Sequence, residues 1–185
     1  MGKIILFDML SLDGFFEGPG GSLDWHNVDE EFQTFAIEQL DAAAGLLFGR
    51  VTFDFMAAFW PGREALELDP MTAERMNGLP KFVFSRAGKI AEWSNSRMVG
   101  EVVPEKLRAM KAESPKDLLL LGSAVLTESL AACGLIDEYR LMINPVILGA
   151  GRPLFSKTGG RRALGLIAAR SFGNGNVLLS YRGMR

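Results

Sequence analysis

Three short segments combine glycine with hydroxyl or arginine side chains directly after an apolar run. They are Gly49-Arg50-Val51-Thr52 after Phe48, Ser85-Arg86 after Phe84, and Gly122-Ser123-Ala124 after Leu121. Glycine lets the backbone approach a phosphate closely, and a helix N-terminus presents unpaired N–H groups to an anion. Arginine matches the phosphate oxygens with its forked donors. The three segments together predict a phosphate site of the nucleotide type.

Each of these segments also has a purely structural interpretation. A Gly-Ser pair at a strand end is commonly a turn and helix cap, and an arginine at a helix start is commonly a surface residue. Their coincidence favours the phosphate site, because ligands of open α/β sheets bind beyond the carboxyl ends of the strands.

The loop Ser11-Leu12-Asp13-Gly14 is a second candidate site. Asp-Gly is a common turn pair, but a carboxylate at a strand end can also bind a polar heterocycle or relay a proton. Trp25 is expected in the core or a pocket wall. His26 fits a surface or capping position better than a catalytic one, and Cys133 is expected to be inert packing.

The elements that must position these residues follow from hydrophobic periodicity and turn residues. Asn27 and Glu30 are interpreted as the capping pair of the first helix, and Pro145 is interpreted as a bulge or an unpaired edge position. The expected strands are Lys3–Leu10, Gly45–Phe48, Lys81–Phe84, Leu118–Leu121 and Tyr139–Leu148, followed by a hairpin of Ala163–Phe172 and Val177–Tyr181. The expected helices are Asp29–Ala44, a short one from Gly49, Asp69–Asn77, one from Pro104 to Ser114, and Ser123–Cys133.

Strands and helices alternate through most of the chain, which implies parallel crossovers. We therefore predict an α/β fold in three layers, with a mixed, mainly parallel sheet, flanking helices and a C-terminal antiparallel hairpin. The 185 residues, 48% of them hydrophobic, are expected to form one domain over residues 1–185.

The charge balance argues against partners that need a strongly basic surface. Lys plus Arg total 20 against 22 Asp plus Glu, so neither nucleic acid nor a membrane surface is expected as a partner. One cysteine permits no intrachain disulfide, and one histidine with one cysteine makes no zinc site. For the same reason, no metal is expected. Without a recognisable targeting segment, a cytoplasmic location is expected.

The motifs resemble those of the dihydrofolate reductase superfamily. Within it, they resemble the branch that contains the C-terminal reductase domain of the riboflavin-biosynthesis deaminase/reductase. The resemblance rests on the segments Ser11–Gly14, Gly49–Phe53, Phe84–Arg86, Gly134–Glu138, Asn144–Gly149, Gly151 and Pro153–Phe155.

This resemblance implies an oxidoreductase similar to 5-amino-6-(5-phosphoribosylamino)uracil reductase. NADPH would be its cofactor, and its substrate would be a small heterocycle of the pterin or ribosylamino-pyrimidine type. Asp13 would face the substrate or the nicotinamide, and a homodimer is expected, with Leu141–Leu148 and Val177–Leu179 as candidate surfaces. The implied cofactor contacts are Gly49, Arg50 and Thr52 with the phosphates, Ser85 and Arg86 with the 2′-phosphate, and Gly122, Ser123, Ala124 and Leu126 with the pyrophosphate.

Two other hypotheses remain open at this point. The riboflavin-type branch has a glutamate where this chain has Leu121, so the protein could bind a nucleotide without catalysing turnover. A dimeric scaffold with no small-molecule ligand is the third hypothesis.

Overall fold

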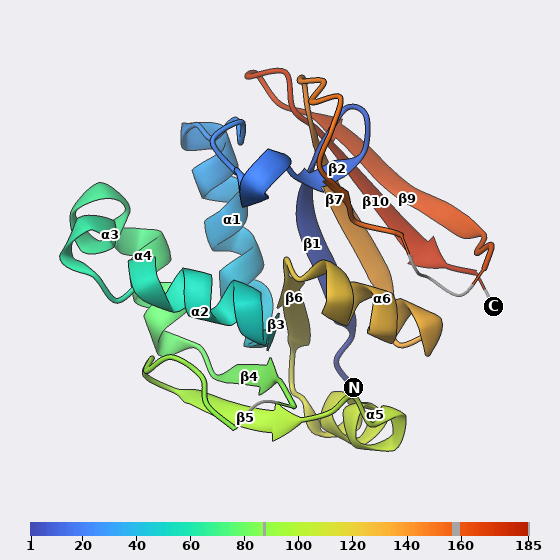
Figure 1. Cartoon of the computed structure of the whole chain (residues 1–185). Coiled ribbons are helices and arrows are strands. Elements are labelled where there is room, and N and C mark those ends of the chain that lie inside the picture. Colours follow the sequence, from blue (N-terminus) through green and yellow to red (C-terminus); the bar gives the residue numbers. More distant parts are fainter. Residues whose placement is uncertain (87, 157–159, 185) are drawn as a thin grey trace.

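An eight-stranded sheet runs through the molecule (Figure 1). The computed structural model describes residues 1–86, 88–156 and 160–184. The strand order is β5-β4-β3-β6-β1-β7-β10-β9. The strands are β1 (Ile4–Ser11), β3 (Ala43–Gly49), β4 (Lys81–Phe84), β5 (Ser96–Gly100), β6 (Asp117–Leu121), β7 (Glu138–Asn144), β9 (Leu164–Ser171) and β10 (Val177–Gly183). A separate two-stranded ribbon pairs β2 (Phe15–Glu17) with β8 (Arg152–Pro153).

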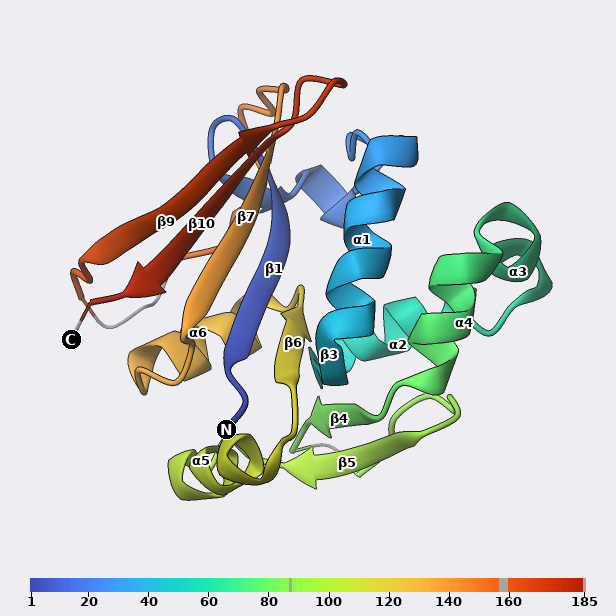
Figure 2. The same ribbon diagram turned by 180° about the vertical axis from the view of Figure 1, so that it is seen from behind.

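The sheet is parallel from β5 to β7 and antiparallel at its other end. β10 runs antiparallel to both β7 and β9, and these last strands extend to one side of the molecule (Figure 2). The predicted fold class is confirmed, including the C-terminal hairpin.

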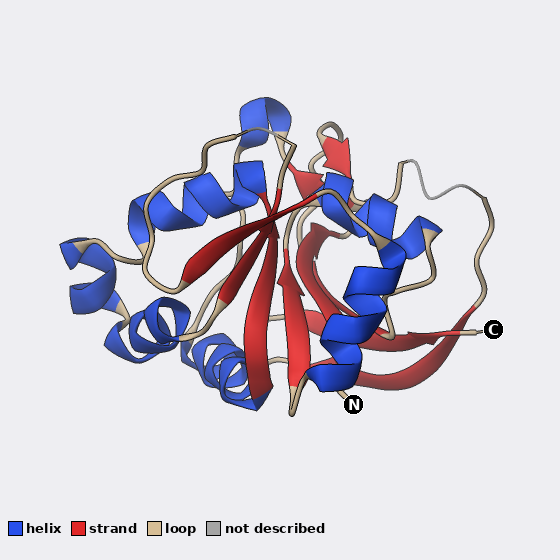
Figure 3. Cartoon of the chain, turned by 90° about the horizontal axis from the view of Figure 1, so that it is seen from below, coloured by secondary structure: helices blue, strands red, loops and turns tan. Residues whose placement is uncertain are grey.

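Helices cover both faces of the sheet (Figure 3). They are α1 (Glu30–Ala42), α2 (Arg50–Phe59), α3 (Arg63–Leu68), α4 (Pro70–Gly78), α5 (Pro104–Glu113) and α6 (Ala124–Ala132), with a 3₁₀ turn η1 at Pro19–Gly21. α1, α2 and α4 pack on one face, whereas α5 and α6 pack on the other. Across the described part of the chain, no helix has the length and apolarity needed to cross a membrane.

Alternate residues of the central strand β6 pack on opposite faces, as its continuous apolar run predicts. Leu118 and Leu120 join the cluster that contains Leu130 of α6, whereas Leu119 joins the cluster that contains Leu40 of α1. The middle of β6 is therefore buried between the two helical layers.

The first helix begins differently from the prediction. Asp29, not Asn27, caps α1, because its Oδ1 accepts a hydrogen bond from the Phe32 N–H at 2.9 Å. Asn27 instead ties its loop to distant segments: its N–H donates to Asn144 Oδ1 at 2.9 Å, and its amide donates to the Asn174 carbonyl at 2.8 Å.

Other corrections concern strand ends and short elements. β7 ends at Asn144 rather than Leu148, because the Asn144 amide donates back to the Leu10 and Met142 carbonyls and the chain turns there. Pro145 therefore follows the strand and does not form a bulge within it. The elements α3, β2, β5 and β8 were not predicted, because they are short and carry little periodicity.

Candidate functional site

The three predicted phosphate-type segments meet at one edge of the sheet. β4, β3 and β6 are neighbours and run parallel, so their carboxyl ends point the same way. The chain leaves β3 through α2 toward β4, and it leaves β6 through α6 toward β7 on the opposite side. Such a reversal of direction opens a crevice between two strands, which is where α/β folds bind ligands.

A cavity of about 840 Å³ lies at this edge, and we call it the polar cavity. Its lining includes eight of the nine predicted cofactor residues, which are Gly49, Arg50, Thr52, Ser85, Arg86, Ser123, Ala124 and Leu126. The ninth, Gly122, lines a neighbouring cavity instead. The fold thus gathers around one cavity most of the cofactor residues that the sequence motifs predicted.

Two helices begin at the polar cavity without a side-chain cap. The N-cap of α2 is Gly49, which has no side chain, and that of α6 is Ser123, whose side chain accepts no hydrogen bond from its helix. The first N–H groups of both helices thus have no capping oxygen, and the positive ends of both helix dipoles lie there. This arrangement suits an anion such as a pyrophosphate.

Glycine is needed at two positions where the ends of β3 and β6 meet. Gly122 has a φ of +59°, and the next residue, Ser123, is also left-handed at +67°. Gly49 approaches this turn so closely that a Cβ on it would lie 2.1 Å from Ser123 Oγ. A side chain at position 49 would therefore displace the Ser123 side chain at the polar cavity.

Arginines supply most of the positive charge in the polar cavity. Arg50 and Arg86 were predicted, and Arg152 joins them from β8. Arg50 pairs with Asp54 at 3.1 Å, but both side chains are substantially exposed, so this ion pair holds Arg50 only weakly. Glu17 and Glu101 also line the cavity.

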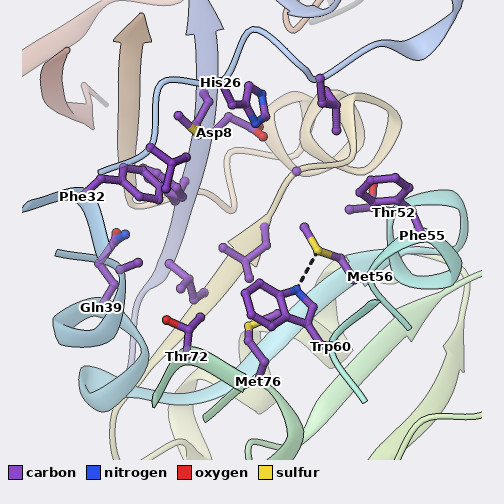
Figure 4. A pocket seen from close by; sticks show the side chains of 18 of the residues that line it. Asp8, His26, Phe32, Gln39, Thr52, Phe55, Met56, Trp60, Thr72 and Met76 are labelled. Atoms are coloured by element: carbon purple, nitrogen blue, oxygen red, sulfur yellow. Dashed lines mark hydrogen bonds between the residues drawn. The ribbon is translucent and has the colours of Figure 1, made fainter. Parts of the chain in front are cut away.

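A second cavity, of about 480 Å³, lies beside the first, on the face of the sheet that α1 covers. We call it the aromatic cavity, because the rings of Phe7, Phe16, Phe32, Phe55 and Trp60 line it (Figure 4). The two cavities share four lining residues, which are Phe16, Glu17, Val51 and Thr52. They are thus two compartments of one site.

Asp8 of β1 provides a buried carboxyl group in the aromatic cavity. The residue is 3% exposed, and its Oδ2 has no hydrogen-bond partner among the described residues. Burial raises the pKa of Asp8 well above its ordinary value, and the nearby Glu17 carboxylate raises it further. Asp8 therefore holds a proton more readily than an ordinary aspartate and can donate it to a ligand.

His26 lies next to Asp8 in the aromatic cavity (Figure 4). Its buried Nε2 has no hydrogen-bond partner within the described chain, and burial lowers the pKa of His26 to about 4. Trp25 packs edge-on against the imidazole, with ring centroids 4.5 Å apart. The imidazole is thus neutral near pH 7 and offers a polar atom to a ligand.

Thr72 and Gln39 lie on the side of the aromatic cavity away from Asp8 and His26 (Figure 4). The buried Thr72 Oγ1 also lacks a partner in the described residues. Gln39 accepts a hydrogen bond from Arg140 through its Oε1 at 3.2 Å. The cavity therefore offers polar atoms at both ends, with aromatic side chains between them.

Asp13 lies outside the residues that line either cavity. Its exposed carboxylate accepts hydrogen bonds from the backbone N–H groups of Leu148, at 3.1 Å, and Gly149, at 2.8 Å. A hydrogen bond from Ser11, followed by these backbone bonds, holds the pKa of Asp13 below its ordinary value. The geometry gives Asp13 the task of fastening the loop after β1 to the loop after β7.

Sequence reasoning missed Asp8, Glu17 and Arg152. Asp8 carried a usable signal, because an acid within an otherwise apolar central strand must be buried. Glu17 and Arg152 carried none, since they face the site through the short pairing of β2 with β8. Among the described residues, no group of three or more histidine, cysteine, aspartate or glutamate side chains is arranged to hold a metal ion.

The fold with its cavity at the switch point is that of the dihydrofolate reductase-like proteins. It superposes on dihydrofolate reductase from Enterococcus faecalis, complexed with NADP(H) and RAB-propyl, with a TM-score of 0.62 at 11% identity, covering 100% of this chain and 98% of the other. Within that class, residues 2–178 match the RibD C-terminal domain, and the chain belongs to that family.

One curated protein and two solved structures show how similar other proteins are to this chain. Bacillus subtilis YyaP is 32% identical over 180 residues, which cover 97% of this chain and 94% of YyaP. A putative riboflavin biosynthesis protein from Shewanella sp. PV-4 superposes with a TM-score of 0.75 at 23% identity, covering 99% of both chains. The Thermotoga maritima diaminohydroxyphosphoribosylaminopyrimidine deaminase/5-amino-6-(5-phosphoribosylamino)uracil reductase has a TM-score of 0.70 at 14% identity, and the match covers 99% of this chain and 57% of that one. The two solved structures are similar in fold.

Proposed function

We propose that the protein is an NADPH-dependent reductase of a small nitrogen heterocycle. The observation that carries this proposal is the shared wall between the two cavities. A dinucleotide with its phosphates at the starts of α2 and α6 can extend past Thr52 and Glu17 toward the aromatic cavity. There it meets a compartment that has aromatic walls and a buried acid. An apolar pocket with a few convergent polar groups is typical of a substrate site.

The residues of the polar cavity fit this cofactor. The turns at Gly49 and Ser123, the first turn of α6 at Ala124 and Leu126, and Thr52 would hold the pyrophosphate. Ser85 and Arg86, after β4, would contact the 2′-phosphate. The uncapped helix starts and the three arginines supply the donors that these phosphates require. An NADP(H) complex of a protein with the same fold supports this choice.

In the proposed reaction, bound NADPH would supply the hydride that reduces a C=N bond of the substrate. The Asp8 carboxyl donates a proton to the nitrogen of that bond, and the resulting carboxylate regains a proton from water. His26 positions the substrate beside Asp8, and the aromatic walls exclude water during transfer. We therefore assign proton donation to Asp8 and a positioning role in the loops to Asp13.

Titration of the purified protein with NADPH, followed by tryptophan fluorescence, tests the proposal. We expect saturable binding at micromolar cofactor. Absence of binding at high micromolar NADPH would refute both the reductase and the non-catalytic nucleotide-binding protein. Binding without NADPH oxidation across a panel of pterins, pyrimidines, quinones and flavins would favour the non-catalytic protein.

We also propose a homodimer that forms through β9. Of the expected surfaces, Leu141 of Leu141–Leu148 is buried in β7, whereas Ile147 beyond that strand is 71% exposed, and Val177 of Val177–Leu179 is 36% exposed. β9 is an edge strand, and its Leu166 and Ile167 are 59% and 50% exposed. An exposed apolar edge strand favours pairing with another chain. Light scattering that reports a monomer at every concentration would refute the dimer.

A further inference from the structure

We infer that the aromatic cavity selects a planar nitrogen heterocycle that carries no phosphate or carboxylate group. The inference rests on the proposed function, because it takes this cavity as the substrate site. It separates the protein from the Thermotoga maritima deaminase/reductase, whose name includes a phosphoribosylamino compound.

The charges that line the aromatic cavity are acidic. Glu17 and Asp69 line it together with the buried carboxyl group of Asp8, and none of its described lining residues is lysine or arginine. An anionic group placed there would lose its hydration and meet side chains of its own sign. The polar cavity next to it has Arg50, Arg86 and Arg152 for that purpose.

The starts of α1 and α4, beside the aromatic cavity, are closed to anions. α1 begins beside it and is capped by Asp29, whose Oδ1 accepts from the Phe32 N–H at 2.9 Å. α4 is capped by Asp69, whose Oδ1 accepts from the Thr72 N–H at 3.1 Å. A carboxylate thus already occupies the N-terminus that a phosphate would need. The first turn of α2 borders both cavities, but its Arg50 belongs to the lining of the polar one.

Arg140 contacts Gln39 of the aromatic cavity lining, but its guanidinium group is already paired with a carboxylate. Arg140 donates to Gln39 Oε1 at 3.2 Å, and its Nε donates to Glu138 Oε1 at 2.7 Å. Arg140 is absent from the residues that line the cavity. It therefore orients Gln39 and is not placed to receive a substrate phosphate.

The remaining polar atoms match a heterocycle. Within the described residues, five buried side-chain polar atoms lack partners, and three of them belong to lining residues of this cavity: Asp8 Oδ2, His26 Nε2 and Thr72 Oγ1. Unpaired polar atoms are costly when buried, so a ligand that pairs with them gains affinity. Ring nitrogens and exocyclic amines can do so from within a plane that stacks between Phe32, Phe55 and Trp60.

Matched ligands that differ only in phosphorylation test the inference. We would measure the binding of 5-amino-6-ribosylaminouracil and of its 5′-phosphate by calorimetry, with and without NADPH, and use pterin as a flat reference ligand. We expect the phosphorylated compound to bind at least about tenfold more weakly than its partner, the size of a single unfavourable charge contact. Equal or tighter binding of the phosphate, or no binding of any of the three ligands, would overturn the inference.

A charge placed at the cavity gives an independent check. Gln33 of α1 lines the aromatic cavity, whereas the next residue, Thr34, is exposed and does not. We expect Gln33→Arg to reduce the ratio between the affinities for 5-amino-6-ribosylaminouracil and for its 5′-phosphate. Thr34→Arg should leave this ratio unchanged. Equal effects of the two variants would overturn the inference. NADPH binding is scored separately, so loss of cofactor binding with retained discrimination would refute the proposed reductase alone.

Discussion

The two cavities at the same sheet edge differ most in how the helices beside them begin. At the polar cavity, α2 and α6 start at Gly49 and Ser123 without a side-chain cap. At the aromatic cavity, α1 and α4 start at aspartates that accept from their own first turns. The polar cavity thus lies at two uncapped helix starts, whereas carboxylates cap the starts of α1 and α4 at the aromatic cavity.

This difference shows how one fold can separate two parts of a reaction. The cap residue decides whether a helix start attracts or repels negative charge, and the capping contact is local. The arginines follow the same division, since they line the polar cavity and not the described part of the aromatic one. In the proposed reaction, the cofactor and the substrate would therefore occupy separate compartments.

The largest expected effect is on Asp8, which defines the chemistry of the aromatic cavity. Asp8→Asn keeps the shape but removes the acidic proton, so turnover should fall by roughly 10²–10⁴-fold. NADPH affinity should stay unchanged, because Asp8 does not line the polar cavity. Stability at neutral pH should rise, since burial of an ionisable carboxyl disfavours the folded state. Steady-state kinetics would measure turnover and the dependence on NADPH, and urea unfolding would measure stability.

Asp13→Asn is the matched control, because it makes the same chemical change outside both cavities. It weakens the bonds to the Leu148 and Gly149 N–H groups, so a modest loss of stability is expected with turnover close to wild type. If Asp13→Asn abolished turnover and Asp8→Asn did not, the catalytic assignment would have to be reversed.

The second effect is a pH dependence that originates in the aromatic cavity. Folded His26 stays neutral down to about pH 4, whereas an unfolded histidine takes a proton near pH 6.5. The unfolded chain therefore binds more protons between these values, and the free energy of unfolding falls as pH drops from about 6.5 to about 4. The loss amounts to at most about 3 kcal/mol.

Asp8 acts with the opposite sign, because its folded pKa is raised and the folded state binds the extra proton. Its contribution is lost as pH rises through that pKa. Comparing wild type with His26→Asn isolates the contribution of His26 to the pH dependence of the free energy of unfolding. Urea unfolding midpoints at several pH values would measure it. His26 is the sole histidine, so its pKa can be followed by NMR without ambiguity. Identical pH slopes in the two proteins would contradict a buried, neutral His26.

The third effect concerns the polar cavity alone. Arg86→Ala should weaken NADPH binding by about tenfold, the size of one charge-assisted hydrogen bond at a partly exposed site. Binding of a flat heterocycle in the absence of cofactor should not change, because Arg86 does not line the aromatic cavity. Arg63→Ala is the control, since Arg63 lies on α3 outside both cavities. A comparable loss in the control would mean that net charge, and not the site, attracts the cofactor.

The polar cavity could be predicted from sequence, whereas the aromatic cavity could not. The turns at Gly49, Ser85 and Gly122 are local signals, and parallel pairing must bring their strand ends to one edge. The apolar strand around Asp8 predicts that this residue is buried, but the cavity that it lines also depends on how α1 packs over β1, which is set by distant contacts. Leu121 illustrates the limit of the sequence analysis. This leucine stands where the riboflavin-type branch has a glutamate, which suggested a protein that binds a nucleotide without turnover. Asp8 and Glu17, however, bring carboxyl groups to the aromatic cavity, which Leu121 also lines.

The capping prediction failed for a related reason. Asn27 and Asp29 are both good N-cap residues, and they lie only two positions apart. Long-range bonds from Asn27 to Asn144 and Asn174 settle the choice, because they hold Asn27 outside the helix. Sequence patterns thus located the start of α1 to within two residues but could not decide which side chain caps it.

The smallest expected effect asks whether the polar cavity binds phosphate through backbone or side chain. Ser123 adopts a left-handed conformation at a cost of about 1 kcal/mol, which Ser123→Gly would relieve. The greater freedom of unfolded glycine offsets part of this gain, so thermal and urea unfolding should show a small net stabilisation. Gly122→Ala should destabilise instead, because its φ is positive and its Cβ would lie 3.0 Å from Thr52 Cγ2. NADPH affinity should survive Ser123→Gly if the uncapped N–H groups hold the phosphates. A large loss of affinity would make the Ser123 hydroxyl the donor and weaken the contrast in helix starts on which the two cavities are distinguished.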